Sequence, residues 1–558
     1  MEFDTLIIGS GAGGLSAAIC LARKGQKVLV LEQHNVPGGW CHSFYINGQR
    51  FSPGVHYLGQ LGKDQSTGKL YKGLGIANDL VFFEMNTSGY EHCRIGVESV
   101  DIPAGYDEMY RVLSERFPEE KKGLKKYLTL IKNVSSQLGA ISEMNGFMDH
   151  LTIPWKTRHL GKYGLFSLKR VIDWHIKNPL LKKVLNIQCG DHGLPPGKAC
   201  FPYHAAVMDH YSNGGFYPMG GGAAIVKAMT KAVKKHGGQI QTSKNVKRIL
   251  LSGDKKKKAI GVELADGERI YAKRIISNTD PGKTFLGLVG ADNLSPKLFK
   301  QLSNTKYSCT SLMLFLTVNM DVSKAGMDSG NIWLMADRDP DEIYHEQMRP
   351  DLDSYDEFNS LFISCSTLKD PTSYDGTNHT IEVITLIGHE AFDIFKSEGE
   401  SHSVEYFALK ERLTEKLLDG LERVLPDVRN HIVQKELGTP LTNMFYLDST
   451  NGCVYGTEKN FWQIGAFSFK PESEIENLYL CGASILANGV AGATYSGVQT
   501  AAKILGCEQA DLLIPEPDQQ LRVYDAEDDS QYPEWLQKKI SQKKTKGLNH
   551  GIQENTID

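Results

Sequence analysis

The chain has 558 residues, of which 41% are hydrophobic and 23% are charged, and its formal net charge is −4. This length allows two or three domains with a large core, and the near-neutral charge excludes a strongly basic nucleic-acid binder. No apolar run approaches the roughly 18–20 residues that a membrane-spanning helix needs, and we recognise no signal peptide. We therefore expect a cytoplasmic globular protein.

The first residues predict a dinucleotide-binding unit. An apolar run at 3–8 predicts a buried parallel strand, and residues 15–24 predict a helix. The turn between them has the G-x-G-x-x-G spacing: its first glycine allows a tight turn, its second lets the backbone approach a pyrophosphate, and its third lets helix and strand pack closely. The helix N-terminus favours phosphate groups. The cofactor contacts predicted in this turn are Gly9, Gly11, Ala12, Gly13 and Gly14.

Two features after the second strand, at 28–31, narrow the choice of cofactor. Glu32 falls where an acid accepts hydrogen bonds from the adenosine ribose, each worth roughly 1.5–3 kcal/mol. Gly38 and Gly39 follow after a short gap, which resembles the flavoproteins with two dinucleotide-binding motifs, where a second glycine pair lies against the flavin diphosphate. We therefore predict FAD as the cofactor, with Gln33 and Trp40 beside it.

A predicted hairpin around Asn47-Gly48 comes next. In flavoproteins of this pattern the hairpin leads the chain past the isoalloxazine ring. His42, His56 and Tyr57, in the two pieces of this hairpin, are candidates for proton transfer, with a hydrogen-bonded structural role as the alternative for each histidine.

Residues 66–212 predict a mainly helical part, with amphipathic patterns at 105–146. Aromatic and basic residues alternate through 155–175, beginning at Trp155. This composition suits a peripheral membrane contact, in which rings lie at the headgroup boundary and cations meet anionic lipid. A solvated helical face over a core is the alternative.

The glycine-rich α/β character returns at 213–300, where the strand at Val246 is expected to touch the adenine through its backbone. Residues 301–439 predict a substrate sheet with strands at 311–318, 361–366 and 381–386, and a long helix at 406–425. In the block at 440–510, a strand ends in Gly482, a small-residue loop follows at 484–493, and a helix runs over 494–505. The helix N-terminus should face the flavin. The predicted contacts there are Gly482, Ala483, Ser484 and Val490, and Tyr495 is a third candidate proton donor.

Ten cysteines are scattered without C-x-x-C spacing, so we expect buried or inert thiols and no metal site. Residues 511–558 predict a C-terminal tail whose last dozen residues are disordered.

From residue 4 to about 507 the chain resembles the phytoene desaturase superfamily of FAD-dependent oxidoreductases, and in places its retinol saturase and carotenoid isomerase branch. The superfamily motifs are the Gly9–Gly14 turn with Glu32, Gly38-Gly39, Gly215-Phe216-Tyr217-Pro218, Gly220-Gly221, Ile276-Ser277-Asn278 and the block from Leu478 to Gly497. The branch motifs are Leu31-Glu32-Gln33-His34, Gly39-Trp40-Cys41-His42-Ser43-Phe44, Gly54-Val55-His56-Tyr57 and Gly438-Thr439-Pro440-Leu441-Thr442-Asn443.

The resemblance implies an α/β fold: a Rossmann-type FAD-binding domain from 1–65, 213–300 and 440–510, a discontinuous α+β substrate domain, and a helical, membrane-facing insertion at 66–212. Two positions depart from the superfamily pattern. Trp40 stands where many members have arginine, and Ala483 stands where many have an aspartate, with Ser484 as a substitute acceptor. Losing one net hydrogen bond should weaken FAD binding by about 1 kcal/mol.

The implied function is oxidoreduction of a C=C bond in a conjugated polyene or isoprenoid lipid, and we expect a retinol or carotenoid saturase. The alternatives are a carotenoid cis-trans isomerase without net redox change, a carotene desaturase, an amine oxidase, and a non-enzymatic escort of prenylated proteins. The sequence has no second G-x-G-x-x-G in a strand-turn-helix context. Electrons should therefore come from an external donor: a reductase, reduced flavin or a quinone.

Overall fold

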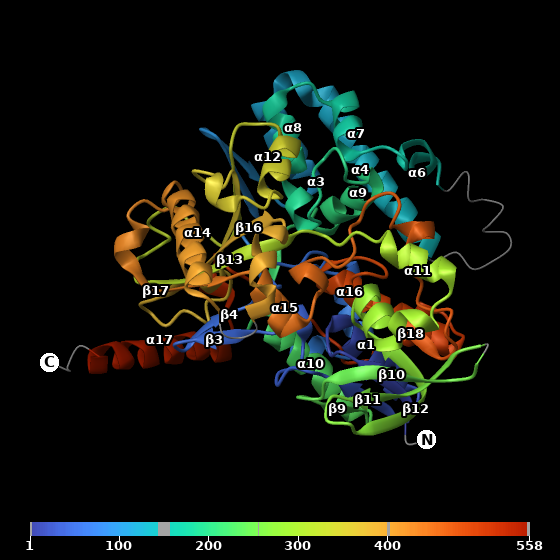
Figure 1. The fold of residues 1–558 in the computed structure, drawn as a ribbon. Helices are drawn as coiled ribbons and strands as arrows, with labels where there is room; N and C mark the ends of the chain where they lie inside the picture. Colours follow the sequence, from blue (N-terminus) through green and yellow to red (C-terminus); the bar gives the residue numbers. More distant parts are fainter. Residues whose placement is uncertain (1–2, 143–156, 255, 399–401, 555–558) are drawn as a thin grey trace.

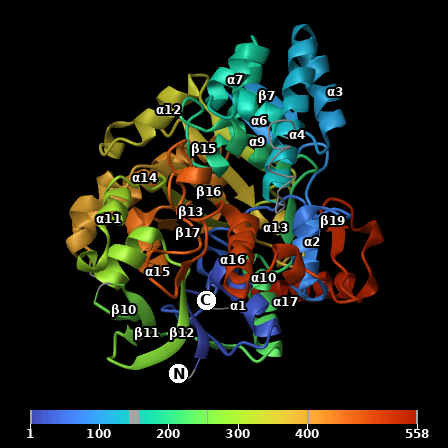
Figure 2. The same ribbon diagram turned by 90° about the vertical axis from the view of Figure 1, so that its right-hand side faces the viewer.

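Two seven-stranded sheets organise the part of the chain that the computed structural model describes, residues 3–142, 157–254, 256–398 and 402–554. In Figure 1 the first sheet lies at the lower right, the second at the left, and a group of helices at the top. Figure 2, turned by 90°, shows the same separation. The site described below lies where these three parts meet.

The first sheet has the strand order β10-β11-β12-β1-β2-β9, and β18 pairs with the end of β12. The pairs of β1 with β2 and β12, of β2 with β9, and of β12 with β18 are parallel. Their carboxyl ends therefore meet at one edge, which is where open α/β sheets bind ligands. The bounds are β1 (Phe3–Ile8), β2 (Val28–Leu31), β9 (Gln239–Gln241), β10 (Val246–Ser252), β11 (Lys258–Leu264), β12 (Arg269–Ser277) and β18 (Leu478–Leu480).

Small residues let the helices of this sheet pack closely. The helices are α1 (Ala12–Arg23), α10 (Gly222–Lys235) and α16 (Gly489–Leu505), and a Cβ on Gly497 of α16 would lie 2.0 Å from the carbonyl oxygen of Gly13 in α1. α16 begins at Gly489, whereas the sequence predicted a loop until 493. The small residues that suggested a loop are the ones that close packing of helices requires, so tertiary packing overrides their low helix propensity.

The second sheet has the order β17-β13-β16-β15-β14-β6-β7, and it confirms that the three predicted substrate-domain strands share one sheet. All nine residues of β13 are buried. One face packs against α14 (Val404–Glu422), and the other faces the helices and the site. The strand bounds are β6 (Glu91–Ile95), β7 (Glu98–Ile102), β13 (Thr310–Val318), β14 (Asn331–Met335), β15 (Ser360–Cys365), β16 (His379–Ile387) and β17 (Ile432–Gly438).

The predicted helical part at 66–212 is only partly helical. β6 and β7 form a hairpin within it, and β6 joins the second sheet by pairing with β14. The turn at Gly96, with φ of 59°, was the missed signal for this hairpin. The helices here are α2 (Ser66–Gly73), α3 (Tyr106–Arg116), α4 (Lys121–Ser142), α6 (Arg158–Tyr163), α7 (Leu168–His175), α8 (Pro179–Asn186) and α9 (Phe201–His210).

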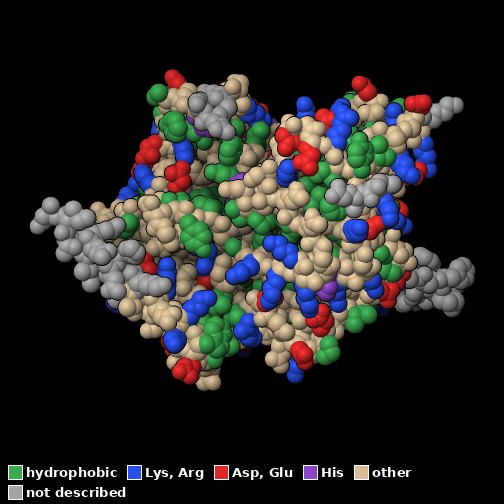
Figure 3. Space-filling model, turned by 90° about the horizontal axis from the view of Figure 1, so that it is seen from below, with side chains coloured by type: hydrophobic (Ala, Val, Ile, Leu, Met, Phe, Trp, Pro, Cys, Tyr) green, Lys and Arg blue, Asp and Glu red, His purple; other side chains and the backbone are tan. Residues whose placement is uncertain are grey.

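Within the described ranges, no helix is long and apolar enough to cross a membrane. Trp155 and Lys156, where the expected membrane contact begins, lie outside the described residues. On the face in Figure 3, lysine and arginine side chains are interspersed with aspartate and glutamate rather than gathered by sign.

Shorter elements complete the fold. The predicted hairpin is β3 (Phe44–Ile46) and β4 (Gln49–Phe51), with Asn47 and Gly48 at positive φ. A third sheet joins β5 (Val81–Glu84), β8 (Phe216–Pro218) and β19 (Arg522–Asp525), and the short helices are α11 (Pro296–Ser303), α12 (Pro340–Gln347), α13 (Ser366–Lys369) and α15 (Pro440–Leu447). α17 (Glu534–Glu554) enters the last dozen residues, where the sequence predicted disorder.

An ion-pair cluster fastens β6 to the segment before β14. His92 Nδ1 lies 2.7 Å from Asp101 and Nε2 lies 2.9 Å from Asp328. Burial disfavours the imidazolium, but the two carboxylates stabilise it by more than burial destabilises it. The pKa of His92 therefore rises from 6.5 to about 9. The charged pairs should therefore stabilise the fold fully below pH 6.5, and this contribution should vanish as the pH rises through about 9.

We expect His92→Gln to destabilise the protein by roughly 1–3 kcal/mol more at about pH 6 than at about pH 9.5. The lower end of this range applies because Asp101 is half-exposed and solvent screens its charge. Urea unfolding of both proteins at each pH measures this difference. An equal loss at both pH values would show that the imidazolium does not contribute.

Candidate functional site

A cavity of about 610 Å³ extends from the carboxyl edge of the first sheet to the inner face of the second. Its volume falls in the range of about 300–1,000 Å³ that is usual for ligand sites. Of the predicted cofactor contacts, all but Gly14 line this cavity: Gly9, Gly11, Ala12, Gly13, Glu32, Gln33, Gly38, Gly39, Trp40, Val246, Gly482, Ala483, Ser484 and Val490. The structure thus brings three distant chain segments to one place.

The glycine turn leaves no room for side chains. A Cβ on Gly11 would lie 2.8 Å from Asn278 Nδ2, and one on Gly13 would lie 2.6 Å from Asn278 Oδ1. Gly14 lies beneath the turn, where a Cβ would come within 2.2 Å of the Gly9 carbonyl oxygen. Bare backbone and the N-terminus of α1 therefore face the cavity, which is the arrangement that binds a pyrophosphate.

Ser10 joins the turn to the predicted ribose acid and to the second glycine pair. Glu32 Oε2 accepts hydrogen bonds from the Ser10 backbone N–H at 2.9 Å and from its hydroxyl at 2.6 Å. The Ser10 hydroxyl accepts in turn from the Gly38 N–H at 3.0 Å, and Glu32 Oε1 accepts from the His34 N–H at 2.9 Å. Sequence reasoning missed Ser10, since a serine between two glycines carries no signal of its own.

The two departures from the superfamily pattern lie on the cavity wall. Trp40 packs its backbone against Gly54, where a Cβ would come within 2.5 Å of the Trp40 carbonyl oxygen. The Ala483 carbonyl accepts from the buried Lys459 Nζ at 2.7 Å, and burial lowers the pKa of Lys459 to about 7. The Ser484 hydroxyl accepts from the Thr457 N–H at 3.1 Å and keeps its own proton to donate and a second lone pair to accept.

These residues fit FAD. The glycine backbones and the N-terminus of α1 would hold the diphosphate, and Glu32 would hold the adenosine ribose. Val246 would border the adenine, while Gly482, which follows β18, and Val490, in the first turn of α16, would face the flavin. The fit has a steric basis. A Cβ at Gly11 or Gly13 would clash with the Asn278 side chain, so only glycine is tolerated at these two positions of the turn.

The other half of the cavity is walled by apolar side chains. They come mainly from β13 to β16 and α12, and Trp333 meets Phe362 edge to face with a centroid distance of 4.7 Å. Because inward-facing residues alternate along each strand, one sheet face supplies most of this wall. The apolar lining comprises Ile187, Leu194, Met313, Trp333, Met335, Ile343, Phe362, Ile384 and Leu386.

Tyr57 brings a hydroxyl group to this apolar half. It donates a hydrogen bond to Asp191 Oδ2 at 2.7 Å, and its ring stacks on Tyr211 with a centroid distance of 4.1 Å. Burial raises the pKa of Tyr57 well above its usual value, so the hydroxyl keeps its proton, and burial together with Glu91 also raises the pKa of Asp191 well above its usual value. Glu91 is fully buried close by, accepts from Trp333 Nε1 at 2.7 Å, and has a pKa that burial raises to about 7.

His56 also lines the cavity and is held from two sides. Its Nδ1 lies 2.9 Å from Glu382 Oε2, and its carbonyl oxygen accepts from Lys369 Nζ at 2.9 Å. Lys369 is fully buried, donates also to Asn331 Oδ1 and Ser364 Oγ, and has a pKa that burial lowers to about 8.

The structure brings His56 and Tyr57 to the cavity but leaves Tyr495 outside its lining. Tyr495 projects from α16 towards α2 and donates to the Ser66 carbonyl at 3.1 Å. Glu91, Asp191 and Glu382 were not predicted. Asp191 lies 134 residues from its partner Tyr57, and Glu382 lies 326 residues from His56, so no local pattern links them.

A comparison with protein families matches residues 12–505 to the flavin-containing amine oxidoreductases. An all-trans-retinol 13,14-reductase of Danio rerio is 27% identical over 526 residues, covering 90% of this chain and 86% of the relative. A chloroplastic prolycopene isomerase of Daucus carota is 28% identical over 524 residues, covering 91% and 81%. An oxidoreductase from Methanosarcina mazei has a TM-score of 0.59 at 16% identity, covering 90% of this chain and all of that one, a likeness in fold.

Proposed function

The chain belongs to the family of flavin-containing amine oxidoreductases, with FAD as its cofactor, and we propose that it adds two hydrogens across one C=C bond of a conjugated polyene. Relatives named for a retinol reductase and for a prolycopene isomerase, each matched over nine-tenths of this chain, support a polyene substrate. A retinoid or carotenoid is the substrate class that best suits the site.

The observation that carries the proposal is the apolar wall that continues from the flavin side of the cavity along the inner face of the second sheet. A flat polyene needs such a surface, since each buried CH₂ group is worth about 0.8 kcal/mol. Trp333 and Phe362 supply aromatic faces and edges to it. The wall also excludes water from the reacting bond.

Bound FAD in its reduced form supplies a hydride equivalent; saturation then needs one proton at the neighbouring carbon. We assign this proton to the Tyr57 hydroxyl, which borders the cavity and is directed by Asp191. His56 is fixed by Glu382 and packs edge to face on Phe362 with a centroid distance of 5.4 Å, so we assign it a positioning role. A positioned general acid, the role assigned to Tyr57, increases the rate of a reaction by about 10²–10⁴-fold.

We expect the anaerobic enzyme, reduced with dithionite, to convert all-trans-retinol or a cis-carotene into a product two hydrogens heavier, as measured by mass spectrometry. A product of unchanged mass but altered retention time would show that the enzyme isomerises its substrate and does not saturate it. Because the sequence carries one dinucleotide-binding turn, we propose an external electron donor, and NADPH alone should not reduce the flavin under these conditions.

We also propose that the surface around α7 contacts a membrane from which the substrate is taken. Leu165 is 85% exposed and Trp174 is 49% exposed, and the Arg170 guanidinium lies 5.2 Å from the ring centroid of Phe166. Exposed apolar and aromatic groups beside a cation suit an anionic headgroup layer. Sedimentation with phosphatidylserine vesicles should recover the protein, and Leu165→Asp should reduce recovery; equal recovery would contradict the assignment.

A further inference from the structure

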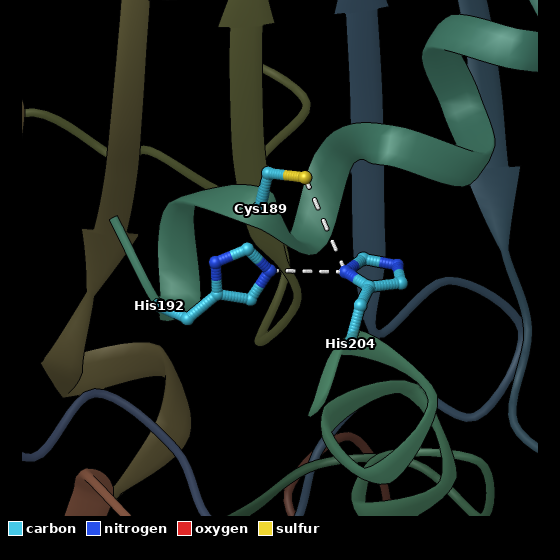
Figure 4. Close-up of side chains that lie close together, drawn as sticks. All are labelled: Cys189, His192 and His204. Carbon is cyan, nitrogen blue, oxygen red and sulfur yellow. Dashed lines mark hydrogen bonds between the residues drawn. The ribbon is translucent and has the colours of Figure 1, made fainter. Parts of the chain in front are cut away.

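Three metal-ligating side chains converge behind the wall of the cavity, where the sequence had predicted no metal site. Cys189 and His192 lie at η4 (Ile187–Asp191), and His204 lies in α9. The ligand atoms of the three residues all lie within 4.8 Å of one another. Figure 4 shows the Cys189 sulfur and a ring nitrogen of His192 both directed at Nδ1 of His204.

The local fold explains why a C-x-x-H pair faces one point. A 3₁₀-helix has about three residues per turn, so positions i and i+3 lie above one another on the same side. The His192 N–H closes this turn on the Cys189 carbonyl. His204 lies in the first turn of α9, which packs against η4 and thereby brings the third side chain to the pair.

Two of the distances between donor atoms come within about 0.5 Å of the edges of a tetrahedral metal site, and the whole set lies within 4.8 Å. His192 Nε2 lies 3.1 Å from His204 Nδ1, and Cys189 Sγ lies 4.0 Å from the same nitrogen. Tetrahedral zinc, with bonds of about 2.0–2.1 Å to nitrogen and 2.3 Å to sulfur, separates its donor atoms by roughly 3.3–3.6 Å. In the absence of a metal, hydrogen bonds from the His192 ring and the Cys189 thiol to His204 Nδ1 account for these two contacts; all three residues offer atoms that can bind a metal at this one point.

The cluster is buried within the fold and is not a chance grouping of surface side chains. His192 is 1% exposed and His204 is fully buried, while Cys189 borders the cavity. The ten cysteines are free thiols, as the sequence predicted, and all belong to the described residues, so Cys189 is available as a ligand. One thiolate and two imidazoles form a ligand set that zinc accepts in sites with an open fourth position.

We propose that Cys189, His192 and His204 bind a Zn²⁺ ion through Sγ, Nε2 and Nδ1. The cation replaces the thiol proton of Cys189, which is released to solvent, and no electron is transferred. The ion would lie behind the wall of the cavity at Cys189, and a water molecule completes its coordination. The site is independent of the proposed polyene chemistry, because its metal content can be measured without substrate.

The test uses the full chain with FAD bound. After dialysis against a weak chelator, elemental analysis should find about one zinc ion per chain. Replacing zinc by Co²⁺ should produce a thiolate-to-cobalt charge-transfer band in the near ultraviolet. Cys189→Ala and His204→Gln should each abolish the band and weaken Co²⁺ binding by more than about 100-fold, beyond what changes in outer partners of a metal site cost.

Cys200→Ala is the matched control. Cys200 is buried and immediately precedes α9, but its sulfur contacts the Gly164 carbonyl instead of the cluster. This variant should retain both the metal and the charge-transfer band. Flavin absorbance and circular dichroism establish that each variant is folded. Absence of the thiolate band in the folded wild-type protein, or an equal metal content in folded Cys189→Ala, would overturn the proposal.

Discussion

Replacing Tyr57 by phenylalanine is expected to lower the turnover of a polyene by about 10²-fold while FAD stays bound. The hydroxyl lies at the cavity wall and donates to Asp191, whereas the ring stacks on Tyr211. Phenylalanine preserves the stacking and removes only the proton-bearing group. Single-turnover oxidation of the reduced flavin by substrate, followed by its absorbance, measures the effect directly.

His56→Gln separates the two neighbouring candidates. Glutamine can still bond Glu382 and keep the loop in place, so we expect less than about a tenfold loss of turnover, as for a positioning residue. If His56→Gln were to lower single-turnover rates as far as we expect for Tyr57→Phe, and Tyr57→Phe were to have little effect, the proton would have to be assigned to His56. The flavin content of both variants should equal that of the wild type.

The second large effect is expected on stability. Lys369→Met should destabilise the fold by about 3–5 kcal/mol, because it leaves buried carboxylates without their cation. Lys369 is fully buried, and the charges of Glu91 and Glu382 oppose the effect of burial on its pKa. Its three hydrogen-bond acceptors, including the His56 carbonyl oxygen, would lose their donor at the same time. Urea unfolding at pH 7 measures the loss.

Lys459→Met provides the contrast. Lys459 is equally well buried, yet its hydrogen bond goes to a carbonyl oxygen and no carboxylate contributes to the shift of its pKa to about 7. Removing it should cost less than about 1.5 kcal/mol, the value of one hydrogen bond. If both variants lost equal stability, the cost at Lys369 would come from packing and not from unbalanced charge.

Local signals were sufficient to predict residues that the fold brings to one end of the cavity. The turn, the acid Glu32 and the second glycine pair lie within 39 residues, and their spacing carries the geometry. The strand that ends at Ser277 and the glycine after β18 could also be placed, because both follow short apolar runs. Ser10 and Asn278 acquire their roles only when the segments pack together.

The substrate half could not be predicted in the same way. Tyr57 could be named from its place after the glycine pair, but Glu91, Asp191 and Lys369 come from distant segments and join it only through packing. The orientation of α16 places Tyr495 on the side that faces Ser66. The spacing of residues along the helix did not reveal this orientation. Likewise, the C-x-x-H pair of η4 acquires its third donor only through the packing of α9.

The strand order of the first sheet also has a consequence for synthesis. β1 is made first, but β18 and the residues up to Ala493 that complete the cavity are made about 480 residues later. At translation rates of about 5–20 residues per second, roughly half a minute to a minute and a half separates the two events. The cofactor can be captured only after nearly the whole chain has been made, and until then the apolar walls of its cavity stay open to other proteins.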